Sequence, residues 1–505
     1  MKISGQIFSA RNIIALFSGA ALPLAFAPYD FFILAILSSA VLIHLWRDAS
    51  PRFAFIYAYL YGLGMFSVGT GWLHISINLF GGVNLVGAIL LTFLFILFIA
   101  LFPGLAGYLF ARLNKKTYPK LSVLLLAPAC WVLLEWIRSW IFTGFPWLNI
   151  GYSQIDSALN GLGPVAGVFG ISFAVMFTAG TLVIILKETL MNRVLISALV
   201  IVLWTTSWLV SKHEWTKPTG DTLTVALVQG AVPQQLKWTA EMLVPTLERY
   251  LELTTPHLGH DLIIWPEAAI PALYDQVEPY IKKLQEMSKA NNSALITGIP
   301  FKDKTTGDYF NSVVMLDDQV SFYFKRHLVP FGEYLPLDAY LRKIVDSLNI
   351  PVSDFSSGPD SAPVITSNNI SIGISICYED VFGEEVIEAL PEADILVNVS
   401  NDAWFGDSSA PHQHMQMARM RAAESGRYLL RSTNTGITAI INEKGKVIDS
   451  IPQFTPATLT GNAVLFEGMT PYARTGNYPV VIFIILILVV IGTLHKLIPP
   501  GKQGD

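Results

Sequence analysis

The chain has 505 residues, of which 52% are hydrophobic and only 14% are charged. This composition is too apolar for an ordinary soluble globular protein, so it favours a membrane protein. The formal net charge of -5 and the lack of a basic tract argue against a nucleic-acid-binding protein, and no nucleic acid partner is expected.

Eight apolar segments approach or exceed the roughly 20 residues that a helix needs to cross a bilayer. They occupy residues 11–27, 31–46, 54–80, 85–113, 121–141, 162–186, 194–210 and 479–497. The first also resembles a cleavable signal peptide, but another apolar segment follows it at once, which favours a retained span. The sequence therefore predicts a seven-span bundle over residues 1–210, a water-exposed domain over 211–478, and a last span with a short tail over 479–505.

Lys and Arg residues predict the orientation of these spans, because positive residues near span ends are retained in the cytoplasm. They fall in alternate connections, at Lys2 and Arg11, Arg47 and Arg52, Arg112 to Lys120, Lys187 and Arg193, and Lys496 and Lys502. Both termini are therefore predicted to be cytoplasmic. The domain over residues 211–478 is predicted to face the other side, which in a Gram-negative bacterium is the periplasm.

Within residues 211–478, strand-like apolar runs alternate with amphipathic helices. Strands are predicted at residues 222–229, 262–265, 294–298, 312–316, 370–376, 395–399 and 438–441, and helices at 239–253, 277–290, 383–390 and 412–425. Such alternation predicts an α/β domain with sheet inside and helices outside.

The chain has two cysteines, Cys130 and Cys377. Cys130 lies inside the apolar run 121–141, whereas Cys377 ends a predicted strand far along the chain, which argues against a disulfide. Cys377 alone is compatible either with a reactive thiol or with a buried, inert one.

Three short segments join a predicted strand end to titratable residues: Ile264-Trp265-Pro266-Glu267, the run from Tyr323 through Lys325 to Glu333, and Ile374 to Asp380 with Cys377 inside it. Strand ends are where ligand crevices lie in α/β folds. Taken singly, each segment is weak, because Glu267 suits a helix N-terminus, Lys325 a charged surface and Cys377 a core.

Together, WPE ending at Glu267, the Lys at Lys325 and CYED beginning at Cys377 resemble the nitrilase, or carbon-nitrogen hydrolase, superfamily. That resemblance implies an α-β-β-α sandwich and a Glu-Lys-Cys triad. The bundle, FPWLNIGYSQ at residues 145–154 and KRHLVPFGEYLP at residues 325–336 resemble the bacterial apolipoprotein N-acyltransferases more narrowly.

The narrower resemblance implies a multi-pass enzyme of the bacterial inner membrane. It implies transfer of a fatty acyl chain from a phospholipid donor to the N-terminal amine of a diacylglyceryl-cysteine apolipoprotein, the last step of lipoprotein maturation. The transfer would pass through a thioester on Cys377, and no cofactor or metal is implied.

Chemistry assigns roles to the triad. A thiol is only slightly ionised at neutral pH, so a nucleophilic Cys377 needs a neighbouring base or cation. Glu267 is the candidate base for the thiol and later for the incoming amine. Lys325 is the candidate cation that holds the thiolate and the oxyanion of each tetrahedral intermediate.

Four further residues match the family's site through the resemblance. Glu333 is expected to position Lys325 or share the work of the base, while Tyr378 and Glu379 are expected to shape the cleft or orient Lys325. Trp238 is expected to contact the phospholipid. The alternatives are a loop carboxylate bonded to backbone for Glu333, and simple packing for Tyr378 and Trp238.

His412 and His414, with Asp402 and Asp407 nearby, superficially resemble metal ligands. The sequence predicts a helix there, and side chains at i and i+2 of a helix diverge, so no metal site is expected. In the predicted spans, His74, Glu135 and Arg138 are costly to bury in lipid, although the last two are spaced to pair with each other.

Two other functions stay open from the sequence. One is a membrane-tethered amidase or nitrilase-type hydrolase that releases ammonia. The other is a transporter whose triad is vestigial, which would call for broken spans and paired charges at mid-membrane.

Overall fold

The computed structural model describes residues 9–114, 118–185, 188–347, 353–367 and 369–497. These residues form two compact units. Unit 1 comprises Met1–Trp72, Ile89–His213 and Thr475–Asp505, and unit 2 comprises Leu73–Ala88 and Glu214–Arg474.

Unit 1 is a helical bundle. Its helices are α2 (Ala10–Ala21), α3 (Ile33–Arg47), α4 (Pro51–Gly69), most of α6 (Leu85–Ile99), α7 (Leu101–Leu113), α9 (Ala127–Arg138), α10 (Gly163–Ile185), α11 (Leu190–Val210) and α19 (Tyr478–Leu497). Small residues let the helices approach closely, since a Cβ on Gly19 would lie 1.9 Å from the carbonyl oxygen of Tyr61.

The number of membrane spans stays a prediction. In the described part of the chain, four apolar helices are long enough to cross a bilayer: Leu85–Leu113, Pro119–Arg138, Ala158–Ile185 and Leu190–Val210. Shorter apolar helices at Ala10–Ala25, Ile33–Arg47 and Tyr478–Thr493 coincide with three more of the eight expected spans.

The third expected span, residues 54–80, is not one straight helix. It is bent by 54° between α4 and α5 (Leu73–Leu79). The break falls at Gly69-Thr70-Gly71, where Thr70 leaves helical geometry. α5 belongs to unit 2, where Phe80 packs edge-on against Trp404 with ring centroids 4.9 Å apart.

The two buried charged residues of α9 hold a loop of unit 1. Arg138 donates to the carbonyl oxygens of Phe145 and Trp147, each at 2.6 Å, and Glu135 accepts from the backbone N–H of Ile150 at 2.8 Å. These contacts satisfy groups that would be costly to leave unpaired in a bundle interior.

Unit 2 contains two six-stranded sheets. The first has the order β12-β1-β2-β3-β4-β5, and the second has the order β11-β10-β9-β8-β7-β6. In chain order the strands of the first sheet are β1 (Lys217–Gln229), β2 (Leu262–Ile264), β3 (Ala294–Lys302), β4 (Tyr309–Leu316), β5 (Val320–Phe324) and β12 (Ala457–Glu467). The second sheet has β6 (Val364–Ser367), β7 (Ile370–Ile376), β8 (Ile395–Ser400), β9 (Leu429–Thr433), β10 (Thr438–Ile441) and β11 (Val447–Ile451).

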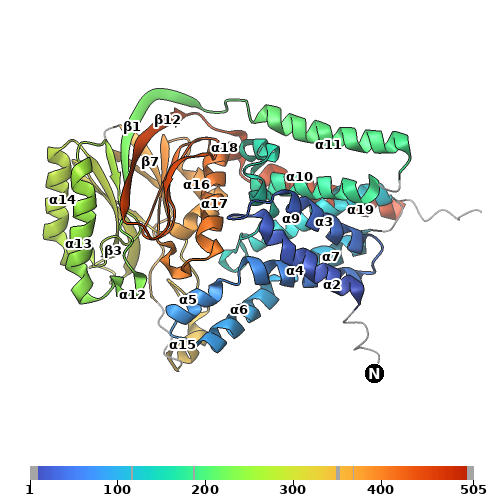
Figure 1. Cartoon of the computed structure of the whole chain (residues 1–505), viewed down its shortest axis with the longest axis horizontal. Helices are drawn as coiled ribbons and strands as arrows, with labels where there is room; N and C mark the ends of the chain where they lie inside the picture. The colour runs from blue at the N-terminus through green and yellow to red at the C-terminus, as the bar shows by residue number, and fades with distance from the viewer. Residues whose placement is uncertain (1–8, 115–117, 186–187, 348–352, 368, 498–505) are drawn as a thin grey trace, which may run out of the picture. The chain divides into compact units, whose positions relative to one another are not determined.

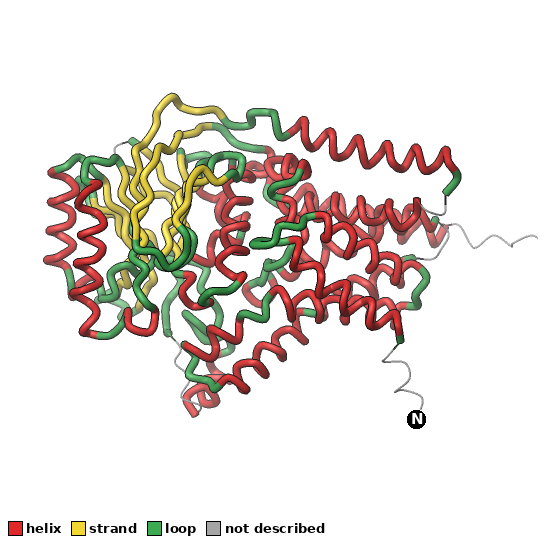
Figure 2. The backbone as a smooth tube through the Cα atoms, in the orientation of Figure 1, coloured by secondary structure: helices red, strands yellow, loops and turns green. Residues whose placement is uncertain are grey.

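The two sheets and their helices form four layers. α13 (Ala240–Thr254) and α14 (Glu278–Ala290) cover the outer face of the first sheet, and α16 (Gly383–Val386) and α17 (Ser409–Ser425) cover that of the second (Figure 1). Figure 2 shows the strands gathered between these helices. The predicted α-β-β-α sandwich is therefore confirmed.

Apolar residues at alternate strand positions explain the layering. Leu227, Ile264, Ile374 and Val397 are among the residues that fill the core between the sheets. Their strand neighbours Ala226 and Ile263 face the other way, into the core beneath α13 and α14. Strands buried on both faces read as continuous apolar runs, which is why β2 and β8 stand out in the sequence.

Candidate active site

The three predicted triad residues all follow strand ends in unit 2. Glu267 comes three residues after the end of β2, Lys325 comes directly after β5, and Cys377 comes directly after β7. Lys325 Nζ lies 3.7 Å from Glu267 Oε1. Glu267 and Lys325 also act electrostatically on Cys377, so the structure brings the three residues together as the sequence predicts.

Lys325 is enclosed by a hydrogen-bonded ring of polar side chains. Its Nζ lies 2.8 Å from Glu333 Oε2, and the side-chain amide of Asn311 donates to both Glu267 Oε1 and Glu333 Oε1 at 2.7 Å. Lys325 is 1% exposed. Burial opposes its charge, but the Glu333 and Glu267 carboxylates outweigh burial and raise the pKa of Lys325, so it stays a cation.

Glu333 is thus a direct partner of Lys325 rather than only a loop carboxylate. It also accepts from the backbone N–H of Val329 at 2.8 Å, so Glu333 makes both the expected contact with Lys325 and the backbone contact of a loop carboxylate. Asn311 is not among the residues that the sequence predicts for this site. It lies in β4, and only the pairing of β4 with β5 places it beside Lys325.

Cys377 sits on a strained turn. Its φ of 51° is left-handed, which costs a non-glycine residue free energy and is typical of functional sites. Burial raises the pKa of the Cys377 thiol, the Glu267 carboxylate raises it further, and Lys325 lowers it. The thiol of Cys377 is therefore neutral at rest.

Glu379 braces the turn against the loop that carries Lys325. One of its oxygens accepts from the backbone N–H of Ile376 at 2.7 Å, and the other accepts from the backbone N–H of Arg326 at 2.7 Å and from the Tyr323 hydroxyl at 2.9 Å. Glu379 thereby fixes the distance between the strand ends that carry Cys377 and Lys325, although it does not itself touch the thiol in the contacts described.

Tyr378 and Trp238 lie in different surroundings. Tyr378 is buried and packs edge-on against Phe382 and His327, with ring centroids 5.1 and 5.6 Å away. Trp238 follows α12 (Gln234–Lys237) and is 52% exposed, so it is not a core residue. The preceding residue, Lys237, donates to the backbone oxygen of Glu267 at 3.2 Å.

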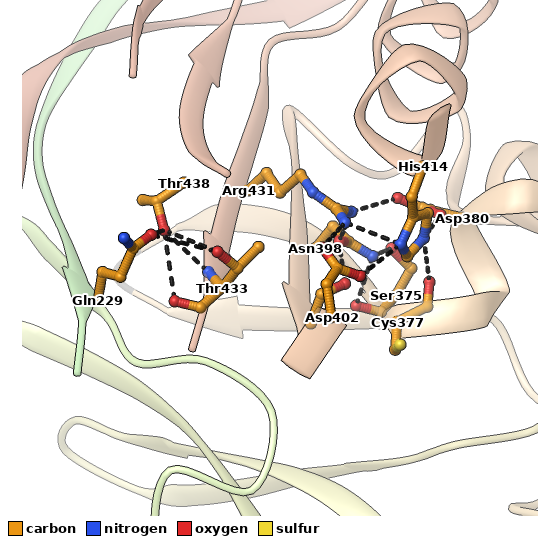
Figure 3. Close-up of polar contacts among 11 residues, drawn as sticks. Gln229, Ser375, Cys377, Asp380, Asn398, Asp402, His414, Arg431, Thr433 and Thr438 are labelled. Carbon is orange, nitrogen blue, oxygen red and sulfur yellow. Dashed lines mark hydrogen bonds and ion pairs between the residues drawn. The ribbon is translucent and has the colours of Figure 1, made fainter. Parts of the chain in front are cut away.

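A buried cluster of charges, absent from the predicted site, lies directly behind Cys377 (Figure 3). It joins His414 of α17, Arg431 of β9, and two carboxylates, Asp380 and Asp402, from turns after β7 and β8. The signal in the sequence was Asp380 in CYED and Asp402 in NVSNDAWFG. His414 and Asp402 also stood together among the apparent metal ligands, but nothing in the sequence showed that Asp380 and Arg431 would meet them.

The other histidine of the suspected metal motif lies elsewhere. His412 Nε2 is 3.0 Å from the side-chain nitrogen of Gln453, whereas His414 contacts Asp380 and Asp402. Side chains at i and i+2 of a helix diverge. Over the described residues, no group of three or more His, Cys, Asp or Glu side chains is placed to hold a metal ion.

A four-layer α/β sandwich with Glu, Lys and Cys at the ends of strands from both sheets defines the carbon-nitrogen hydrolase class of domain. The family model for carbon-nitrogen hydrolases matches residues 224–465, and that for the apolipoprotein N-acyltransferase N-terminal domain matches residues 18–181. A solved carbon-nitrogen hydrolase superfamily protein from Xanthomonas campestris is 15% identical, with 48% of this chain and 91% of that chain covered. The TM-score between the two structures is 0.35.

Full-length relatives narrow the class to one family. An apolipoprotein N-acyltransferase of Methylococcus capsulatus is 43% identical over 475 residues, which is 93% of each chain. One of Coxiella burnetii is 40% identical over 479 residues, covering 95% of this chain and 99% of the relative. The chain belongs to the apolipoprotein N-acyltransferase family.

Proposed function

We propose that this chain transfers a fatty acyl chain from a phospholipid to the N-terminal amine of a diacylglyceryl-cysteine apolipoprotein, through a thioester on Cys377. The observation that carries the proposal is the buried Glu267–Lys325 pair acting on a strained cysteine. Family membership supports acyl transfer rather than ammonia release as the reaction. The bent span between α4 and α5 would suit a transporter, but membership of the apolipoprotein N-acyltransferase family favours acyl transfer over both alternatives.

The first half-reaction forms the thioester. As Cys377 Sγ attacks the ester carbonyl of the phospholipid, its proton passes to Glu267. Lys325 stabilises the negative charge on the carbonyl oxygen, an effect commonly worth about 3 kcal/mol per donor. The ester C–O bond then breaks, the lysophospholipid oxygen takes the proton back from Glu267, and the acyl group stays on the sulfur.

The second half-reaction forms the amide. The N-terminal amine of the apolipoprotein attacks the thioester carbonyl, Lys325 again supports the oxyanion, and the C–S bond breaks. The amine loses one proton, through Glu267, to the departing sulfur. Because the pKa of Cys377 is raised, the sulfur leaves protonated, and the enzyme returns to its resting state.

The supporting residues take positions in this scheme. Glu333 holds Lys325 together with Glu267, Glu379 fixes the turn, and Tyr378 packs against Phe382 and His327. Exposed Trp238 is assigned to the phospholipid. We place the catalytic domain, residues 211–478, on the periplasmic face of the bacterial inner membrane. There both lipid substrates can be reached without extracting an acyl chain into water at about 0.8 kcal/mol per CH₂.

The test is mass spectrometry of the purified protein after incubation with phospholipid alone. We expect an acyl mass on the Cys377 peptide and an equal amount of lysophospholipid, and loss of both in Cys377→Ala. Cys130→Ala is the matched control and is expected to acylate normally, because Cys130 is fully buried in unit 1. Acylated apolipoprotein made at an undiminished rate by Cys377→Ala would disprove the proposal.

A further inference from the structure

The charge cluster behind Cys377 is part of neither half-reaction. Its four charged residues, Asp380, Asp402, His414 and Arg431, are each at most 3% exposed. Arg431 donates to Asp380 Oδ2 at 2.8 Å, to Asp402 Oδ2 at 3.0 Å and to the side-chain oxygen of Asn398. A buried ionic cluster is costly to desolvate, so its presence beside a nucleophile calls for an explanation.

The imidazole of His414 stands between the two carboxylates. Its Nδ1 is 2.8 Å from Asp402 Oδ1, and its Nε2 is 2.7 Å from Asp380 Oδ1 and 3.3 Å from the carbonyl oxygen of Cys377. Carboxylate and carbonyl oxygens only accept hydrogen bonds, so a ring with such oxygens at both nitrogens is best satisfied when both carry a proton.

Arg431 offers the competing arrangement. One of its terminal nitrogens is also 2.9 Å from His414 Nδ1, so a neutral ring could accept there instead. The net charge of the cluster favours one of these two protonation states of the ring. With a neutral ring the cluster holds two anions and one cation and carries a net charge of -1. With an imidazolium it holds two of each and is neutral.

The net charge of the cluster affects the pKa of the Cys377 thiol. Asp402 already raises the pKa of Cys377, which shows that the charge of the cluster is felt at the sulfur. Burial and Arg431 lower the pKa of His414, but Asp380 and Asp402 outweigh them and raise it to about 9. Helix α17, which carries His414, also packs against α16 and against the turn that begins at Cys377.

We propose that His414 is a positioning residue held as an imidazolium. Together with Arg431 it balances the charges of Asp380 and Asp402, so that the Cys377 thiolate forms beside a cluster with no net charge. The same ring holds the carbonyl oxygen of Cys377 and so stabilises the strained turn. This role adds a positioning residue to the proposed acyl transfer, and it rests on Cys377 being the nucleophile of that reaction.

The test measures the rate of Cys377 alkylation by iodoacetamide against pH, followed on the Cys377 peptide in full-length protein. His414→Gln removes a positive charge, and we expect the midpoint of the profile to move up by about one pH unit. Asp402→Asn removes a negative charge and moves it down. The double variant His414→Gln/Asp402→Asn restores neutrality, and its midpoint returns toward that of the wild type.

The double variant separates the explanations. If His414 were neutral, His414→Gln would leave the midpoint unchanged and the double variant would match Asp402→Asn, which would overturn the proposal. A purely structural role would lower the alkylation rate equally at every pH, with the double variant worse than either single one, and would overturn it too. His412→Gln, on the same helix but outside the cluster, is the matched control and leaves the profile unchanged.

A second measurement does not depend on the variants folding. In wild-type protein with nitrogen-15-labelled histidine, we expect one ring to keep the imidazolium signal at pH 8, where exposed histidines are neutral. Loss of every imidazolium signal by pH 7 would overturn the proposal. Alkylation of Cys377 needs no lipid, whereas the acyl mass on the Cys377 peptide reports acyl transfer. A wrong assignment of His414 is therefore distinguishable from a wrong assignment of the reaction.

Discussion

At the scale of single residues, unit 2 buries two lysines in opposite electrostatic situations. Lys325 has two carboxylates around it, which raise its pKa above the usual value. Lys237 is also fully buried, but its ammonium group donates to the backbone oxygen of Glu267, which is uncharged. Burial therefore lowers the pKa of Lys237 to about 8, with only partial compensation from Glu267. A cation that is so poorly compensated costs stability.

Lys237 should make the stability of the protein depend on pH. Its pKa is about 8 in the fold and 10.5 in the unfolded chain, so between these values the unfolded state binds more protons. Stability then rises with pH across that window. The shift corresponds to a cost on the order of 3 kcal/mol below pH 8, at about 1.4 kcal/mol per pKa unit.

Lys237→Met tests this expectation. We expect its thermal unfolding midpoint in detergent to exceed that of the wild type at pH 7, with the difference shrinking as the pH rises from 8 to 10.5. Lys283→Met, at an exposed position of α14, is the control and should show no such trend. A constant difference between Lys237→Met and wild type across the window would contradict the assignment.

At the scale of elements, the position of Glu267 depends on β3. Gly298 in β3 donates its N–H to the Pro266 carbonyl and accepts from the N–H of Ile270 with its own carbonyl, each at 3.2 Å. A Cβ at Gly298 would lie 2.4 Å from the backbone nitrogen of Ala268 and 2.6 Å from the oxygen of Pro266. Backbone cannot yield to such contacts, so the loop carrying Glu267 would shift.

Gly298→Ala should therefore slow acyl transfer without touching a catalytic group. A misplacement of about 1 Å can cost on the order of a hundredfold in rate, and we expect kcat to fall by at least tenfold. Gly332→Ala is the matched control, because its Cβ would meet only Val329 at 3.5 Å, an ordinary contact. Steady-state kinetics on both variants decide the point, and equal rates would show that β3 does not position Glu267.

At the scale of the whole molecule, the apolar helices and the distribution of Lys and Arg govern which side of the membrane each unit faces. The four long apolar helices support a multi-span membrane protein. The orientation with cytoplasmic termini and a periplasmic catalytic domain is a prediction from the positive residues alone.

Cysteine accessibility tests that orientation. In a variant without native cysteines, we expect Thr305→Cys, in the exposed turn between β3 and β4, to react with a membrane-impermeant maleimide in intact spheroplasts. Asp48→Cys, between α3 and α4, should react only after lysis. The reverse pattern would place the catalytic domain in the cytoplasm and remove the proposed access to lipoprotein substrates.

The sequence by itself determined the features that follow from local pattern. Isoleucines at alternate positions predicted β7, and the apolar residues after Thr438 predicted β10, both with their observed bounds. Motifs at strand ends identified Glu267, Lys325 and Cys377. Strands β5, β6, β9, β11 and β12 were not predicted, because their residues are mixed or short and gain their strand geometry from pairing with neighbours.

Only the tertiary structure decided how distant residues complete the site. Asn311 and Glu333 reach Lys325 through strand pairing and a loop, and His414 and Arg431 meet behind Cys377 from a helix and a strand that are remote in sequence from the nucleophile. Likewise, α5 packs against the turn Asp402–Phe405, which is remote from it in sequence. Local propensity cannot encode these contacts, because each one depends on the free energy of bringing separate segments together in the folded core.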